Sequence, residues 1–288
     1  MATYSNENYN YAGYASGRPS YNPDFPKFII EYHKRIPSNQ TDTVVDVATG
    51  TGISARYLSG YFKRVIGTDI SPKMLEVASQ SNTSDSNVEY MVCPGEDMSE
   101  IPDHSVDVVA SATGAHWFDS EKFANEARRI LKPNGTLAIY GYSGFGSFID
   151  YPECDVLMRE YGIDVLGPYW DTGRQVLERL YSHYNVLLRE MDFKDVFMGV
   201  YPKDVIPYIG TNYTLMEKPH VINFKITWRA LHKYLDSWSS LSNYHVKHPN
   251  KRRLSDVYVE KMMAVANETD FEKEINFEWG QSVVLARV

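Results

Sequence analysis

The sequence predicts an α/β fold built on a doubly wound parallel sheet, and three observations lead to this prediction. Short runs of apolar and β-branched residues alternate with segments of helical periodicity between Thr43 and Tyr142. Acidic residues lie in or just after three of these runs, where ligands of such sheets bind. A turn with two glycines, Thr49–Gly52, joins the first run to a helix. We therefore expect a ligand site at the carboxyl ends of the strands.

The first strand and its turn, Thr43 to Leu58, organise the chain. The strand is apolar or β-branched except at Asp46, whose carboxylate is costly to bury without a ligand or a donor. Gly50 and Gly52 allow a tight turn and a close approach of backbone to a ligand. A strand, a glycine-rich turn and a helix N-terminus form a nucleotide cradle, although any α/β protein can use such a turn without a ligand.

The second and third strands also end near acids. The second runs from Arg64 to Asp69, and a carboxylate at this place binds ribose hydroxyls in Rossmann-like sheets. The third, Val88 to Val92, leads into Gly95-Glu96-Asp97. Three strands thus bring carboxylates to one edge of the sheet.

Helix-capping and helix-ending residues predict the remaining elements of this region. Ser71-Pro72 opens a helix, with Ser as its cap and Pro in its first position. Asp119 can cap a later helix, which Pro133-Asn134-Gly135 ends. The other predicted elements are a helix over Pro23–Lys34 and strands over Val106–Ser111 and Thr136–Tyr142.

The alternation breaks after Tyr142, where loop signals surround short helices. A stripe of Trp228, Leu231, Leu235 and Trp238 has helical spacing. The chain ends in a long strand with a bulge, or in a hairpin. The other predictions are helices near Glu153–Tyr161 and over Gln175–Tyr184, a strand over Phe193–Tyr201, and a helix that carries Tyr258, Met262 and Val265.

Several motifs together resemble the class I S-adenosylmethionine-dependent methyltransferases. They are DVATGTG (Asp46–Gly52), GTD (Gly67–Asp69) and GED (Gly95–Asp97). The similarity is closer to a fungal branch of small-molecule enzymes, typified by trans-aconitate methyltransferase and the cantharidin-resistance methyltransferase. It covers nearly the whole chain, and one departure is Ala48-Thr49, where the branch usually has Gly-Cys. The further shared motifs are RPSY (Arg18–Tyr21), AHWFD (Ala115–Asp119), DYPE (Asp150–Glu153), GPYW (Gly167–Trp170) and TWRALHKYLDSWS (227–239).

The resemblance implies a seven-stranded Rossmann-like sheet with an added helical lid, and S-adenosyl-L-methionine as the cofactor. No metal is implied. Asp69 is then expected to bind the two ribose hydroxyls. Gly50 and Gly52 let the backbone approach the methionine part of the cofactor. Asp46 is expected to accept hydrogen bonds from the loop amides or from the cofactor ammonium group.

The other expected cofactor contacts come from two segments. Glu96 or Asp97 would face the adenine or its amino group, and Met98 could add an apolar contact. The N-terminal segment forms a cap over the cofactor in the resembled branch. Tyr14 and Arg18 in this segment could hold the methionine carboxylate or an anionic substrate.

The substrate is expected after the fourth strand, where His116 and Trp117 lie. His116 would point into the pocket as a hydrogen-bond donor or as a general base, although a histidine satisfied by backbone at a turn fits equally. Trp117, Trp170 and Trp228 are candidate walls, and such tryptophans also serve as core. Arg174 is a candidate clamp for a carboxylate.

We expect a single methyltransferase domain over residues 1–288, with an N-terminal cap over 1–34. The cofactor-binding core would span 43–142. A substrate lid with one core strand would span 143–270, and the C-terminal strand would span 271–288. The family resemblance implies that this last strand is antiparallel to the rest of the sheet.

The composition of the chain argues against several kinds of binding partner. The chain has 288 residues, 43% of them hydrophobic, and a net charge of −8, which argues against nucleic acid. Two cysteines give no disulfide framework and no metal cluster, so a reducing compartment is expected. No apolar run approaches the ~20 residues of a membrane span. The N-terminus has no secretory or mitochondrial signal pattern, so we expect a cytoplasmic enzyme, assumed monomeric, without a membrane partner.

The expected reaction is methyl transfer to a small molecule. The resemblance implies a carboxylate oxygen of an anionic metabolite of the trans-aconitate type. The alternative is a hydroxyl group of a small molecule or xenobiotic, the cantharidin type, with His116 as the base. A nicotinamide-dependent dehydrogenase is a rival because Gly50-x-Gly52-x-x-Ala55 also fits the dinucleotide fingerprint. A cofactor-binding regulator without turnover is also open.

Overall fold

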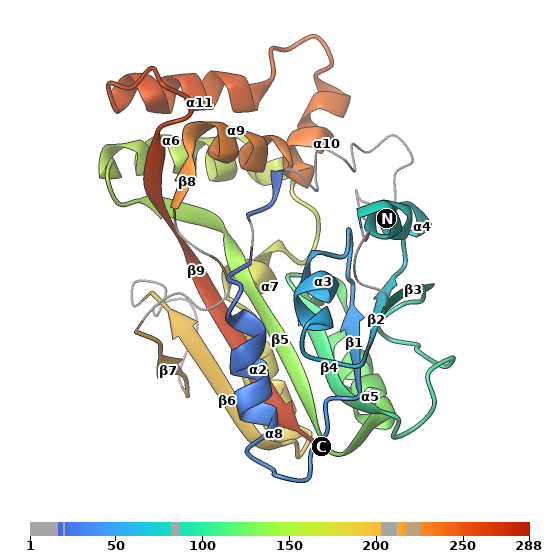
Figure 1. The fold of residues 1–288 in the computed structure, drawn as a ribbon. Coiled ribbons are helices and arrows are strands. Elements are labelled where there is room, and N and C mark those ends of the chain that lie inside the picture. Colours follow the sequence, from blue (N-terminus) through green and yellow to red (C-terminus); the bar gives the residue numbers. More distant parts are fainter. Residues whose placement is uncertain (1–16, 20, 82–86, 203–211, 218–221, 223–224) are drawn as a thin grey trace. The chain divides into compact units, whose positions relative to one another are not determined.

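The computed structural model (Figure 1) describes residues 17–19, 21–81, 87–202, 212–217, 222 and 225–288. The chain divides into two compact units. The first, the helical unit, comprises the described parts of Met1–Ser20, Ser143–Arg174 and Asn223–Gly280. The second, the sheet unit, comprises those of Tyr21–Tyr142, Gln175–Ile222 and Gln281–Val288. The boundaries fall inside two long strands, β5 (Leu131–Phe148) and β9 (Glu274–Arg287).

The sheet has the strand order β3-β2-β1-β4-β5-β9-β6-β7 among the described residues. Strands β1 to β5 are parallel, and β9 runs antiparallel to β6. This is the predicted doubly wound sheet with an antiparallel C-terminal strand, and β7 adds a short edge. The other bounds are β1 Thr43–Val47, β2 Arg64–Asp69, β3 Val88–Val92, β4 Val106–Ala112, β6 Lys194–Tyr201 and β7 Thr214–Leu215.

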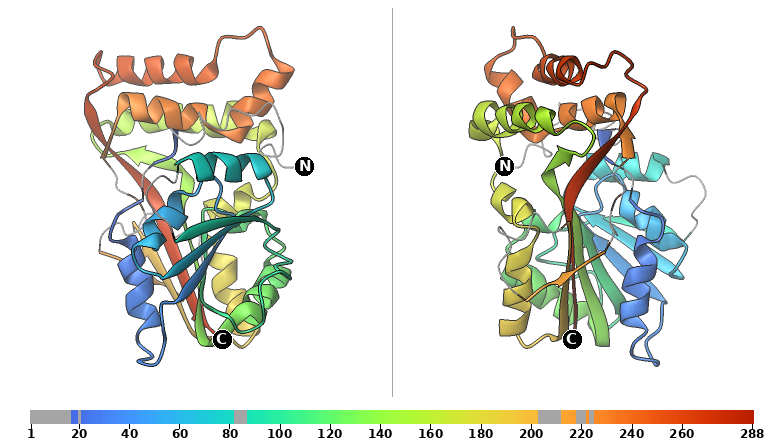
Figure 2. Two further views of the ribbon diagram at one scale, coloured as in Figure 1. Left: turned by 45° about the vertical axis from the view of Figure 1, so that its right-hand side comes forward. Right: turned by 90° about the vertical axis from the view of Figure 1, so that its left-hand side faces the viewer.

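Helices cover both faces of this sheet, as the edge-on view in Figure 2 shows. Helices α2 (Phe25–His33), α3 (Ile53–Ser59) and α4 (Pro72–Ser81) lie on one face. Helices α5 (Ser120–Ile130) and α8 (Ser182–Glu190) lie on the other. Their apolar sides pack on strands whose side chains are buried on both faces, which explains the continuous apolar runs.

Two of the predicted helix caps are present. The amide of Met74 donates to the Ser71 hydroxyl (3.3 Å) at the start of α4. The amide of Lys122 donates to the Asp119 carboxylate (3.3 Å) at the start of α5. Both helices therefore begin where the sequence places them: α4 directly after β2, and α5 after the 3-10 turn Ala115–Trp117 that follows β4.

The helical unit contains α6 (Asp155–Arg159), α9 (Trp228–Asp236), α10 (Ser239–Lys247) and α11 (Leu254–Val265). The π-helical turn Glu160–Val165 continues α6. Strand β8 (Lys225–Thr227) pairs antiparallel with the first residues of β9. The Thr227 side chain then caps α9 by accepting from the Ala230 amide (3.1 Å).

Two sequence predictions in the later part of the chain were wrong. The single helix expected over Gln175–Tyr184 is two helices, α7 (Arg174–Glu178) and α8, because Leu180 and Tyr181 have left-handed backbone with φ of 51° and 58°. The stripe expected on one helix is split, since α9 ends at Asp236 and Trp238 follows it. No glycine or proline, which would predict a helix end, lies at either break.

Candidate active site

The turn after β1 has an unusual backbone. Ala48, Gly50 and Gly52 all have positive φ, at 55°, 56° and 75°. An added Cβ at Gly52 would lie 2.4 Å from the Tyr90 hydroxyl oxygen, whereas one at Gly50 meets no described atom within 4 Å. Gly52 is therefore required by packing, and Gly50 leaves open space beside the backbone.

Asp46 lies in β1 with its side chain fully buried. Its Oδ2 accepts a hydrogen bond from the Thr49 hydroxyl (2.6 Å), and Oδ1 has no hydrogen-bond partner among the described residues. Burial raises the pKa of Asp46 to about 6, which the nearby Thr49 and Ser54 hydroxyls and the Ala55 amide partly oppose. Because Oδ1 makes no hydrogen bond of normal geometry with the described residues, it can accept one from a cationic or hydrogen-bonding ligand.

Asp69, at the carboxyl end of β2, joins two loops. Its Oδ2 accepts from the Gly50 amide and its Oδ1 from the Ser71 amide, both at 2.9 Å. Burial raises the pKa of Asp69, and the two amides oppose this rise. Since each carboxylate oxygen can accept two hydrogen bonds, both oxygens can still accept one from a ligand hydroxyl.

The acids after β3 occupy different environments. Glu96 is half-buried, and its Oε1 accepts from the Asp119 amide (2.9 Å). Asp97 is exposed and accepts from the Ser99 amide (3.2 Å). Met98 is fully buried in the hydrophobic core. The structure therefore places Glu96 and Asp97 at the surface of this segment, and Met98 behind it.

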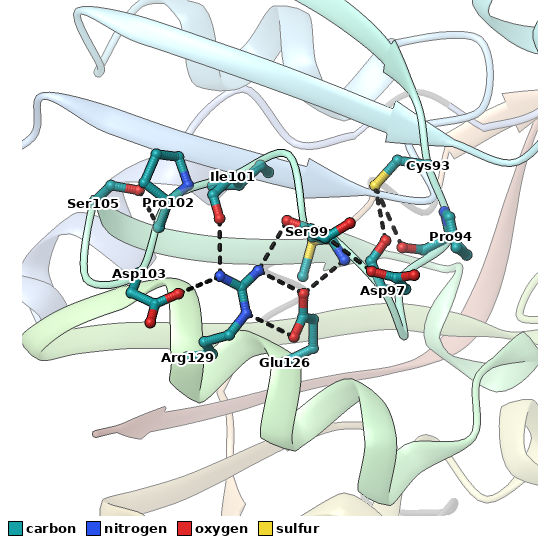
Figure 3. Close-up of polar contacts among 11 residues, drawn as sticks. Cys93, Pro94, Asp97, Ser99, Ile101, Pro102, Asp103, Ser105, Glu126 and Arg129 are labelled. Atoms are coloured by element: carbon teal, nitrogen blue, oxygen red, sulfur yellow. Dashed lines mark hydrogen bonds and ion pairs between the residues drawn. The ribbon is translucent and has the colours of Figure 1, made fainter.

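An ion-pair network on α5 holds this segment in place, as Figure 3 shows. Glu126 accepts from the Met98 amide (2.6 Å) and from the Arg129 guanidinium (2.7 and 2.9 Å). Arg129 also donates to Asp103 (2.5 Å) and to the carbonyls of Met98 (2.9 Å) and Ile101 (3.0 Å). The guanidinium lowers the pKa of the Glu126 carboxyl.

His116 follows β4 in a 3-10 turn, Ala115–Trp117. Its Nδ1 lies 3.1 Å from the hydroxyl oxygen of Tyr181, and its ring centroid is 4.7 Å from that of Trp117. Gly114, two residues earlier, packs against the turn after β1, because an added Cβ would lie 2.7 Å from that of Ala48. The segment of His116 and the glycine turn are thus neighbours.

The structure therefore brings Asp46, Gly50, Asp69 and the segment of His116 to the carboxyl edge of the sheet unit. The sequence analysis missed Thr49, although its hydroxyl follows Asp46 at a distance of three residues. It also missed Tyr181, which lies 65 residues from His116 in sequence and has no local signal.

The other expected site residues belong to the helical unit. The Arg174 guanidinium lies over the rings of Phe145 and Trp170, 4.0 and 3.9 Å from their centroids. Trp170 donates its indole N–H to the Gly162 carbonyl (2.8 Å). The structure thus brings Arg174 and Trp170 together.

Two further expected residues of this unit make other contacts. Trp228 is fully buried and stacks on Phe148 with ring centroids 5.5 Å apart. Arg18 lies 5.9 Å from the ring centroid of Tyr234. Tyr14 lies outside the described residues, as does most of the expected N-terminal cap.

None of the helices among the described residues is long and apolar enough to cross a membrane. Nor does the described part of the chain contain a group of three or more His, Cys, Asp or Glu residues that could hold a metal ion.

The two glycines allow a matched test of the turn. Gly52→Ala should lower the free energy of unfolding by about 2 kcal/mol, because strain at positive φ adds to the clash with Tyr90. Gly50→Ala should cost only about 1 kcal/mol, from the backbone alone, yet weaken ligand binding by filling the open space. Urea unfolding and calorimetry with S-adenosylhomocysteine measure the two effects. Equal stability losses would contradict this distinction.

Comparisons with known proteins find similarity to methyltransferases. Residues 45–139 match the family described as "Methyltransferase domain". A Saccharomyces cerevisiae protein described as a "probable S-adenosylmethionine-dependent methyltransferase" is 29% identical over 99% of this chain and 98% of its own. A methyltransferase of Aspergillus terreus is 36% identical, over 45% of this chain and 41% of its own.

Among solved structures, a "putative type II methyltransferase" from Anaeromyxobacter dehalogenans has a similar fold. The TM-score is 0.64 at 20% identity, over 94% of this chain and 97% of that one. At this identity the likeness concerns the fold alone.

Proposed function

We propose that this chain, whose residues 45–139 match a methyltransferase domain family, is an S-adenosylmethionine-dependent methyltransferase that methylates a carboxylate oxygen of a small anionic metabolite. The trans-aconitate type of acceptor comes from the resemblance of motifs such as AHWFD at Ala115–Asp119. The observation that supports it most is His116 beside the Tyr181 hydroxyl, near the glycine turn. This geometry suits a histidine that orients an acceptor.

The residues at the carboxyl edge of the sheet unit fit the cofactor. Asp46 has a buried oxygen without a partner among the described residues, and we propose that it meets the ammonium group of the amino acid part. Asp69 has an acceptor position left on each oxygen for the two ribose hydroxyls. Glu96 or Asp97 would then face the adenine. Bound here, S-adenosylmethionine supplies an electrophilic methyl group.

The chain's own task is then to hold the acceptor in line and to exclude water. A carboxylate is already ionised at pH 7 and needs no base. His116 would therefore act as a donor that orients the acceptor. Arg174 and Arg18 stay candidate carboxylate partners from the sequence, since a planar guanidinium matches a carboxylate.

The alternative acceptor is a hydroxyl group. A hydroxyl must lose its proton during transfer, so His116 would have to act as a general base. Either ring nitrogen of His116 can carry the proton in its contact with Tyr181, so the distance alone allows both roles. The two acceptors differ in how the rate depends on pH.

We expect the methylation rate to stay level between about pH 6 and 8. His116→Asn should retain much of the activity, because asparagine keeps a hydrogen-bonding side chain but cannot act as a base. Initial rates with labelled cofactor measure both. The matched control is His183→Asn, which changes a histidine bound to Ser120 (2.9 Å) on the neighbouring helix. A rate that rises with a pKa near ~6.5 and collapses only in His116→Asn would support the hydroxyl acceptor instead.

A further inference from the structure

Tyr181 makes the contact that fixes the chemistry of His116. Its hydroxyl oxygen lies 3.1 Å from His116 Nδ1, and its side chain is fully buried. A buried tyrosine hydroxyl that bonds to one nitrogen of a histidine determines which nitrogen carries the proton. The other nitrogen, Nε2, is then left with one defined character, donor or acceptor.

The backbone that presents Tyr181 is strained. Leu180 and Tyr181 both have left-handed φ, at 51° and 58°, and neither is glycine. Each such residue costs on the order of 1 kcal/mol. The surroundings hold the pair in place, because Ser282 donates to the Leu180 carbonyl (2.7 Å) and the Tyr181 amide donates to the Val176 carbonyl (3.1 Å). Strain that is held in this way often marks a functional position.

Strand β5 leaves room for the ring. An added Cβ at Gly141 would lie 2.8 Å from Tyr181 Cε2 and 3.0 Å from the Thr113 hydroxyl oxygen. Any larger residue at 141 would therefore displace the tyrosine. Glycine inside a strand weakens the strand, so its presence beside this ring fits a close approach that the fold requires.

Other contacts hold the backbone of the His116 segment. Tyr184 donates its hydroxyl to the Ala115 carbonyl (3.0 Å), and His183 contacts the Ser120 hydroxyl (2.9 Å). The segment is thus attached to α8 without help from the Tyr181 hydroxyl. The Tyr181 hydroxyl, by contrast, contacts the His116 ring itself.

We propose that Tyr181 is a positioning residue that donates its hydroxyl proton to Nδ1 of His116. A phenol O–H is a stronger donor than an imidazole N–H, and an imidazole nitrogen is a stronger acceptor than a phenol oxygen. The bond therefore holds neutral His116 with its proton on Nε2. In this form Nε2 is a hydrogen-bond donor and cannot take a proton. That this N–H meets a carboxylate of the acceptor rests on the proposed function.

Nitrogen NMR of the ligand-free protein, labelled in its histidines, tests the proposal directly. Spectra are recorded above about pH 8, where an ordinary histidine is neutral, and His116→Asn assigns the signal. We expect a protonated Nε2 and an unprotonated Nδ1 in the wild type. A protonated Nδ1 would overturn the proposal, and this outcome requires no variant of Tyr181 to fold.

Two hydroxyl deletions complete the test. Tyr181→Phe keeps the ring beside Gly141 and should give a mixture of the two neutral forms of His116. Tyr184→Phe removes a hydroxyl of α8 that bonds to the Ala115 carbonyl and not to the His116 ring, and it should leave the His116 proton on Nε2. Once an acceptor is known, Tyr181→Phe should lower kcat about 2- to 10-fold with little change in KM, as expected for one lost hydrogen bond.

The role of Tyr181 and the proposed acceptor can fail independently of each other. The same His116 signal in Tyr181→Phe as in the wild type would overturn the role of Tyr181. A hydroxyl acceptor would overturn the proposed function, yet the position of the proton in the ligand-free protein would stand on its own measurement.

Discussion

Replacing Asp46 by asparagine should make the folded chain more stable at pH 8 and weaken its binding of S-adenosylmethionine. The carboxyl group is fully buried, and burial raises its pKa to about 6, above the usual 3.8. Holding it ionised above pH 7 therefore costs about 3 kcal/mol, which the neutral amide avoids. The same change removes the charge that we propose for the ammonium group, so affinity should fall about 10-fold or more.

The stability change caused by Asp46→Asn should depend on pH. A carboxyl with a raised folded-state pKa binds more protons folded than unfolded between about pH 4 and 6, so it makes the wild type less stable as pH rises. The stability gain of Asp46→Asn should be small at pH 4 and full above pH 7. Urea unfolding at several pH values, and calorimetry with S-adenosylhomocysteine, measure the two parts.

Asp107 provides a matched control on the neighbouring strand. It is also buried, but it accepts from Lys132 (2.9 Å) and from the Asp42 and Thr43 amides (3.1 and 2.9 Å). Asp107→Asn should therefore lower stability, by about 1–3 kcal/mol. If both variants changed stability in the same direction, the missing partner of Asp46 would not explain its cost.

Replacing Arg129 by methionine should lower the free energy of unfolding by about 3 kcal/mol. The change leaves Glu126, whose side chain is only 13% exposed, without its cation. It also removes donors from the Met98 and Ile101 carbonyls, which fix the segment after β3. Cofactor affinity should fall as well, because Glu96 and Asp97 belong to that segment.

The control for this variant is an arginine of an exposed ion pair. Arg64 pairs with Glu89 at 2.5 Å, with side chains 58% and 50% exposed. Arg64→Met should change stability by less than about 1 kcal/mol. Urea unfolding at pH 7 compares the two, and a loss of similar size in both would argue against the network in Figure 3.

The first half of the fold was predictable because its signals are local. The bounds expected for β2 and β3 are those observed, since each is an apolar run closed by a turn or a cap. The glycines at 50 and 52 likewise predicted a tight turn, and both have positive φ in the structure. The resemblance to methyltransferases came partly from the same stretch, although Gly50-x-Gly52-x-x-Ala55 alone also fitted a nicotinamide enzyme.

The rest was not predictable because tertiary contacts decide it. Leu180 and Tyr181 divide a helical pattern, and the bond from Ser282 that holds them crosses 102 residues of sequence. The pairing of His116 with Tyr181 arises only when β4 and α8 meet. Met98 was expected near the adenine on sequence position, whereas the structure places its side chain in the core.

The most direct test of the proposed acceptor is the stability of the product bond. The pure enzyme is incubated with methyl-labelled S-adenosylmethionine and a pool of small metabolites, and labelled products are separated by mass before and after mild alkali. Methylation of a carboxylate gives an ester, so alkali should release the label as methanol. A label that survives in the product as an ether would contradict the account and identify a hydroxyl acceptor.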